Sequence, residues 1–150
     1  MRAFAFVSVM ILASISFASG LAINDGTYSG QGFFTNSETG ADENYSSTLT
    51  IENGAVSMSY VYASGFSYTL NYTIVDGVNG LFTVMYAGAP AGTGYCAERS
   101  CHMDMNYVDS EFGAVQISRT MSWNEENDIS VIGHNMTMKK FFVEELERQD

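Results

Sequence analysis

Arg119 is the residue whose type and position most directly suggest chemistry. It lies between Ile117 and Met121 in the β-rich run 114–123, where every second residue is apolar. Alternate residues of a strand face the same side, so this spacing puts the guanidinium on an apolar face. A buried guanidinium is costly unless it meets a carboxylate or several acceptors, and it can bind a carboxylate through two parallel hydrogen bonds. We expect an anchor for a fatty-acid-like ligand; a β-bulge, a barrel-end position and an internal acid partner are the alternatives.

Tyrosine is the second unusual feature of the apolar faces. In the run 66–74, apolar or aromatic residues take every even position, and Ser, Thr and Asn take every odd one. A buried tyrosine hydroxyl needs a hydrogen-bond partner, which favours a ligand cavity, although an ordinary packed core remains the alternative. Together with Arg119, the residues expected to line the cavity are Tyr60, Tyr62, Tyr68, Tyr72, Tyr86 and Trp123.

A second kind of site is suggested by His134, Met136 and Met138, which share one face if their strand is regular. Thioethers combined with an imidazole are soft ligands that suit Cu(I). Small exported copper-carrying barrels look similar, sometimes with a tryptophan near the metal, and Trp123 is the candidate for that part. The alternative is that these methionines fill gaps in a core.

Cys96 and Cys101 are the two cysteines, and four residues separate them. In an oxidising compartment such a pair predicts one disulfide, here closing a four-residue hairpin loop. Because His102 follows directly, covalent haem attachment is an alternative, although its usual spacing has only two residues between the cysteines. Zinc would need more ligands than two histidines and an oxidised pair can supply.

Signatures of catalysis are missing from the sequence. It contains no Gly-x-Ser-x-Gly, no His-Glu-x-x-His and no phosphate-binding loop. The acidic run 124–128 reads as a solvated turn, and a His102–Asp104 pair would have no nucleophile beside it. We therefore expect a protein that is not an enzyme and needs no cofactor.

The elements that position these residues are β-strands. Runs rich in β-forming residues alternate with turn residues, and Asn53-Gly54 is a strong hairpin signal. A glycine loop is expected at 88–94. The tail from Lys139 is ambiguous, because Glu144 and Arg148 are spaced for a helical i,i+4 pair, whereas residues 139–143 could form a strand that ends near Val143. The expected strands are residues 27–34, 45–52, 55–63, 66–75, 81–87, 103–108, 114–123 and 129–138, with the cysteine hairpin before the sixth.

These short connections predict an all-β, antiparallel, up-and-down meander of about eight strands. Closure into a barrel removes the two exposed edges, and a barrel of this size holds side chains or one small ligand.

The first 20 residues resemble a cleaved export signal, and the remaining 21–150 make one domain. Arg2 precedes an apolar stretch, and small residues at Ser16 and Ala18 place cleavage near residues 18–20. The chain after cleavage carries a formal charge near −12, with 5 basic and 17 acidic residues. This charge argues against nucleic acid and anionic membrane surfaces as partners. We expect a secreted or periplasmic protein that is not an integral membrane protein.

The opening Gly26-Thr27-Tyr28, followed by a hairpin meander, resembles the start of a lipocalin-like (calycin) barrel. Tyr28 takes the position of the usual tryptophan. The resemblance implies that a basic residue of the last strand packs on this ring, with Lys139 or Lys140 as candidates, and that the barrel is a cup for a small apolar molecule.

The sequence thus predicts a non-catalytic binding protein for a small apolar or amphipathic ligand in a Tyr/Met-lined barrel. The alternatives are a periplasmic Cu(I) binder and a structural or protein-interaction barrel with a filled core.

Overall fold

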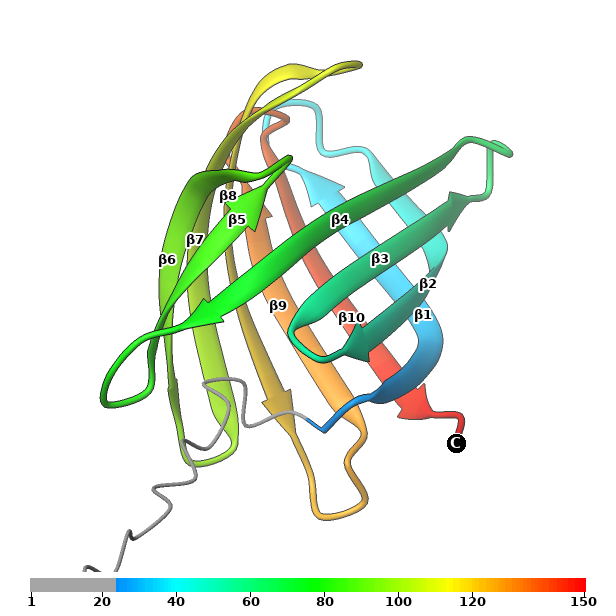
Figure 1. Ribbon diagram of the computed structural model, residues 1–150. Coiled ribbons are helices and arrows are strands. Elements are labelled where there is room, and N and C mark those ends of the chain that lie inside the picture. The colour runs from blue at the N-terminus through cyan, green and yellow to red at the C-terminus, as the bar shows by residue number, and fades with distance from the viewer. Residues whose placement is uncertain (1–23) are drawn as a thin grey trace, which may run out of the picture.

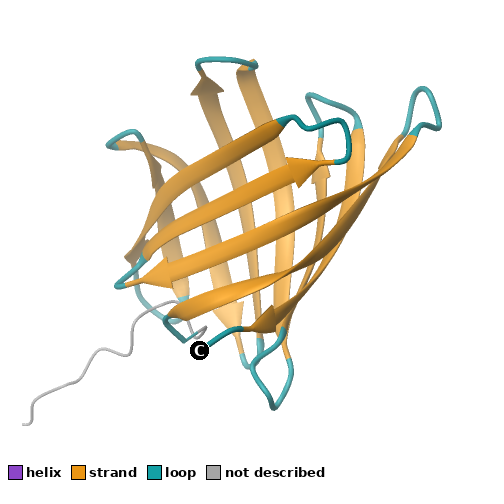
Figure 2. Ribbon diagram, turned by 90° about the vertical axis from the view of Figure 1, so that its right-hand side faces the viewer, coloured by secondary structure: helices purple, strands orange, loops and turns teal. Residues whose placement is uncertain are grey.

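Alternation of apolar and polar residues predicts strands along most of this chain, and the computed structural model contains only strands and turns in residues 24–150, the part that it describes. The expected export signal at residues 1–20, with its cleavage near 18–20, lies outside the described residues. Figure 1 shows the strands side by side around one barrel, and Figure 2 shows the short turns that join them at both ends.

Ten strands form the barrel, and each pairs antiparallel with its neighbours in sequence. The last strand pairs with the first from Tyr28–Arg148 to Asn36–Lys140, which closes the sheet and leaves no edge. The strands are β1 (Gly26–Asn36), β2 (Asp42–Glu52), β3 (Ala55–Tyr62), β4 (Ser67–Asp76), β5 (Leu81–Tyr86), β6 (Ala89–Ala97), β7 (Ser100–Asp109), β8 (Gly113–Trp123), β9 (Ile129–Asn135) and β10 (Lys140–Arg148).

The expected meander and closure are confirmed, but the expected count of about eight strands is wrong. One missing strand is β6, which covers the segment expected to be a glycine loop. Gly92 and Gly94 lie within β6 because the neighbouring strands approach too closely for a side chain at these positions. A Cβ on Gly94 would lie 2.4 Å from the His102 carbonyl oxygen. Glycine here allows close packing and does not mark a turn.

The other underestimated strand is β10, which continues to Arg148 and does not end near Val143. Its length changes the partner of Tyr28. Arg148, directly opposite Tyr28 in the register, holds its guanidinium 6.0 Å from the centre of that ring. The expected partners Lys139 and Lys140 lie at the other end of β10, so the basic residue on the Tyr28 ring is Arg148.

The two halves of the interior differ in packing. Near the end where residue 24 and the C-terminus lie, apolar side chains fill the space, including Leu49, Met58, Met103 and Met121, all fully buried. At the opposite end, where the turns after β1, β3, β5, β7 and β9 lie, the interior contains a hollow. We refer to these as the packed end and the open end.

The Cys96–Cys101 disulfide joins β6 and β7 next to their turn at the packed end. The two residues face each other in the register, and Ala97 and Ser100 still pair beyond them. The turn therefore consists of Glu98 and Arg99 alone, two residues shorter than expected. The disulfide prediction is confirmed.

Reducing this disulfide should lower the free energy of unfolding by about 2 kcal/mol, because the closed loop is short and constrains little of the unfolded chain. Urea unfolding with and without reductant measures the difference. A Cys96→Ser/Cys101→Ser double variant should match the reduced protein and be insensitive to reductant. Loss of the β-sheet signal on reduction would contradict this local role.

Candidate functional site

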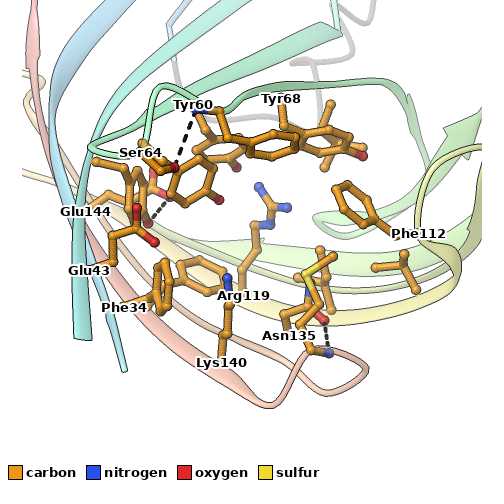
Figure 3. A pocket seen from close by; sticks show the side chains of 18 of the residues that line it. Phe34, Glu43, Tyr60, Ser64, Tyr68, Phe112, Arg119, Asn135, Lys140 and Glu144 are labelled. Atoms are coloured by element: carbon orange, nitrogen blue, oxygen red, sulfur yellow. Dashed lines mark hydrogen bonds between the residues drawn. The ribbon is translucent and has the colours of Figure 1, made fainter. Parts of the chain in front are cut away.

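A cavity of about 270 Å³ occupies the open end of the barrel (Figure 3). Every strand except β5 and β6 contributes inward residues to its walls. Nine of its nineteen lining residues are Phe or Tyr, and only Leu70, Val115, Ile117 and Met138 are aliphatic or thioether side chains. The cavity is thus mainly an aromatic chamber that opens toward solvent at one end.

Arg119 stands in the middle of this chamber, where Figure 3 shows its guanidinium between Glu144 on one side and Phe112 on the other. Only 2% of the side chain is exposed. Its Nη1 donates toward the Met58 sulfur, and its guanidinium carbon lies 5.9 Å from the centre of the Tyr72 ring. Within residues 24–150, Nε has no hydrogen-bond acceptor and no carboxylate forms an ion pair with the guanidinium.

This arrangement leaves an always-charged group with unused donors in a place that water reaches poorly. A thioether is a weak acceptor, and a ring face attracts a cation without satisfying its N–H groups. An anionic or strongly accepting group in the cavity would supply the hydrogen-bond acceptor that the surrounding residues do not provide. The position of Arg119 on an apolar face, expected from the sequence, is therefore confirmed, and the alternative of a close internal acid partner is not what the structure shows.

Glu144 of β10 is the second buried charged group in the cavity wall and is fully buried. Its carboxylate accepts hydrogen bonds from the Tyr45 hydroxyl at 3.0 Å and the Ser47 hydroxyl at 3.1 Å. Burial raises the pKa of Glu144 above its ordinary value, and the positive charge of Arg119 and these two hydrogen bonds only partly oppose that shift. The carboxyl group therefore holds its proton more tightly than an exposed glutamate does.

Two glycines make room for the rings of the chamber. A Cβ on Gly32 would lie 2.2 Å from the Tyr45 ring, and one on Gly133 would lie 2.2 Å from the Phe142 ring. Both glycines face inward, and each lies across from the aromatic residue in the strand register. Their lack of a side chain lets these rings lie flat against the wall.

Another part of the wall is held by Asp109 at the end of β7. It accepts the Tyr68 hydroxyl at 2.8 Å, the Tyr86 hydroxyl at 3.3 Å and the backbone N–H groups of Glu111 and Phe112. Burial alone would raise the pKa of Asp109, but these donors outweigh it and hold the pKa below its ordinary value. Asp109 thus ties two tyrosines to the turn that carries Phe112, whose ring lies edge-on to Tyr68 at 5.2 Å.

Lys140 and Glu43 provide charge nearer the mouth of the cavity. The Lys140 ammonium lies 3.7 Å from the centre of the Phe34 ring and 5.7 Å from that of Tyr62. Burial lowers the pKa of Lys140, although the negative charge of Glu43 opposes this. Burial raises the pKa of Tyr62 to about 12 with help from Glu144 and Glu43, so its hydroxyl stays neutral near pH 7.

The residues expected to line a cavity fall into two groups. Tyr60, Tyr62, Tyr68 and Arg119 do line it. Tyr72, Tyr86 and Trp123 do not: Tyr72 is buried beside Arg119, the Tyr86 ring packs on Tyr107 at 4.4 Å, and Trp123 lies at the packed end. Of the methionines in residues 24–150, only Met138 reaches the cavity, because most of the others there fill the packed end.

Sequence reasoning missed Glu144, Phe142 and Lys140 because it left the tail ambiguous. The signal was present, since Lys140, Phe142, Glu144, Leu146 and Arg148 alternate with more exposed residues along β10. Glu144 and Arg148 were interpreted as a possible helical pair, whereas both belong to the inward-facing parity of one strand.

The expected shared face of His134, Met136 and Met138 is wrong. Strand β9 ends at Asn135, so the two methionines lie in the following turn. His134 stacks on Phe141 with 4.1 Å between ring centres, Met136 is exposed, and Met138 lines the cavity. In the described part of the chain, no three His, Cys, Asp or Glu side chains are grouped to hold a metal ion.

Comparison with known proteins adds no assignment: no family model, no curated protein and no solved structure matches this chain. No helix in residues 24–150 has the length and apolar character to cross a bilayer.

Replacing Glu144 by glutamine should change how stability depends on pH. Because the folded chain raises this pKa above 4.5, the stabilising contribution is fully present below pH 4.5 and is lost as pH rises through the folded pKa. The stability of Glu144→Gln relative to the wild type should therefore increase with pH above 4.5. Urea unfolding between pH 4 and 8 measures this.

The matched control is Glu147→Gln, an exposed position on the same strand. Its unfolding free energy should differ from the wild type by an amount that depends little on pH. A Glu144→Gln difference that stays constant across the range, or that falls as pH rises, would show that burial does not raise this pKa.

Proposed function

We propose that this protein is an exported, non-catalytic binding protein that holds a small apolar or amphipathic molecule in the cavity at the open end of its barrel. The observation that carries the proposal is the buried Arg119 guanidinium, which faces this cavity without a hydrogen-bond acceptor at Nε among the described residues. The ligand's acidic group would bind Arg119, and its apolar body would lie against the rings.

The free-energy cost of burying Arg119 supports a binding role. Burying a guanidinium without acceptors is expensive, and no packed barrel would need one at this position. A cavity with mainly apolar walls and a few convergent polar groups is the usual form of a small-molecule site. Arg119, Glu144 and the tyrosine hydroxyls are such groups, and they lie within one chamber.

Export is supported by the character of residues 1–20 and by the Cys96–Cys101 disulfide, which is typical of oxidising compartments. The closed meander, together with Arg148 on the Tyr28 ring, is compatible with a lipocalin-like barrel, and we propose this relationship. The cavity counts against a filled structural barrel. No observation favours the Cu(I) alternative, because its three residues do not share a face.

Native mass spectrometry of the protein purified from the organism that makes it tests the proposal. We expect an additional organic mass that is lost on denaturation, and its formula would give the ligand class. A copper-sized increment would instead support the metal alternative. A bare protein mass that stays bare when the stripped chain is incubated with an extract of host small molecules would contradict the proposal.

The variant Arg119→Met should weaken binding of an acidic ligand by about 10-fold to 100-fold, since a charge-assisted hydrogen bond contributes about 1.5–3 kcal/mol. Methionine keeps a similar shape and removes the charge. Arg99→Met, which removes an exposed arginine that pairs with Glu125 at the packed end, is the control and should leave affinity unchanged. Equal affinity for wild type and Arg119→Met would contradict the anchor.

A further inference from the structure

The chamber is too small and too rigidly aromatic for the fatty acid that the sequence first suggested. From its geometry we infer that the ligand is a compact aromatic monocarboxylic acid, held by its carboxylate on Arg119 with its ring among Tyr60, Tyr68 and Phe112. This inference deepens the proposed function and rests on it.

The volume of the chamber favours a compact ligand. A cavity of about 270 Å³ lies just below the range of about 300–1,000 Å³ that is usual for small-molecule pockets. A carboxylate attached to one ring through a short linker fills this volume. With its carboxylate on Arg119, a long-chain fatty acid would extend past the mouth and leave most of its tail in water, where burial contributes nothing.

The rings of the chamber lie in orientations that aromatic pairs favour, and another ring would extend this arrangement. Tyr60 and Tyr68 are nearly parallel, with 10° between their planes and 6.4 Å between centres. Tyr45 lies edge-on to Tyr60 at 5.7 Å, and Phe112 lies edge-on to Tyr68 at 5.2 Å. Edge-to-face and offset contacts are the favoured geometries between rings, so an aromatic guest gains attraction from each ring pair beyond what its buried area gives.

The walls of the chamber are held rigidly, which favours a planar ligand. Hydrogen bonds to Asp109 fix Tyr68, and the Asp109 contact to the Phe112 backbone N–H fixes the turn that carries the Phe112 ring. Tyr45 is held by Glu144. A planar guest with few rotatable bonds loses little entropy in such a chamber, whereas an alkyl chain must freeze many torsions to match it.

The charge pattern selects one acid group. Arg119 is the buried cation without an acid partner in the described residues, while Lys140 at the mouth already has Glu43 near it and the Phe34 ring beneath it. Glu144, on a strand that only β9 separates from the strand of Arg119, disfavours a second carboxylate deep in the chamber, because two like charges would share a poorly solvated space. A monoacid therefore suits the site better than a diacid.

Calorimetric titration of the purified chain with four probes tests the inference: hydrocinnamate, octanoate, palmitate and hydrocinnamyl alcohol. Hydrocinnamate and octanoate share a carboxylate and have similar size but differ in the ring, whereas the alcohol keeps the ring and removes the charge. We expect hydrocinnamate to bind about tenfold more tightly than each of the other three.

The variant Phe112→Leu separates ring recognition from size. It should bring the affinities for hydrocinnamate and octanoate to within about threefold of each other, chiefly by weakening hydrocinnamate. Phe141→Leu, on the outer surface where 53% of the side chain is exposed, is the control and should leave all affinities unchanged.

The outcomes separate the inference from the function on which it rests. Tighter binding of octanoate or palmitate would overturn the aromatic class and leave the proposed carrier function in place. Equal binding of hydrocinnamyl alcohol would overturn the requirement for an acid. The absence of saturable binding by all four probes would overturn the inference, while native mass spectrometry would still decide separately whether the protein carries another molecule.

Discussion

The pairing of β1 with β10 is the constraint on which the rest of this structure depends. It closes a ten-stranded sheet, so that every strand has two neighbours and every second side chain faces a common interior. The diameter of a barrel grows with the number of strands, and a barrel of eight is just wide enough for side chains to fill. Ten strands give an interior that side chains fill at the packed end and leave hollow at the open end.

The hollow is maintained by the same interactions that make it selective. Large rings cover its walls, and inward glycines at Gly32 and Gly133 give two of those rings room to lie flat. Hydroxyl groups that burial would otherwise penalise are bonded to Asp109 and Glu144. Among the described buried side chains, the Tyr72 hydroxyl, His134 Nε2 and Arg119 Nε have no hydrogen-bond partner, and of these three residues Arg119 is the one that lines the chamber and carries a charge. This contrast distinguishes a binding chamber from a packing defect.

Sequence periodicity predicted the class of fold and much of the inward surface. The alternation in β3, β4 and β8 put Tyr60, Tyr68 and Arg119 on inner faces, as the structure has them. It failed where a local signal had two physical meanings. Glycines at 92 and 94 were interpreted as a loop, although they permit close contact between strands, and Glu144 with Arg148 matched a helical spacing as well as the parity of a strand.

Periodicity could not predict where each inward residue lies along the barrel axis. Inward parity says that Trp123 and Tyr72 face the interior, but not whether they lie at the packed end or in the chamber. That depends on strand tilt and register around the whole barrel, which are set by long-range pairing. For the same reason His134, Met136 and Met138 were grouped by spacing alone, although the chain turns after Asn135.

A crystal structure of the protein as purified from its own source would test the central claim most directly. We expect electron density for a small molecule in the chamber at the open end, with an acidic group within hydrogen-bonding distance of the Arg119 guanidinium and the remainder against Tyr60, Tyr68 and Phe112. An Arg119 guanidinium bonded directly to Glu144, in an interior filled by protein side chains, would contradict it.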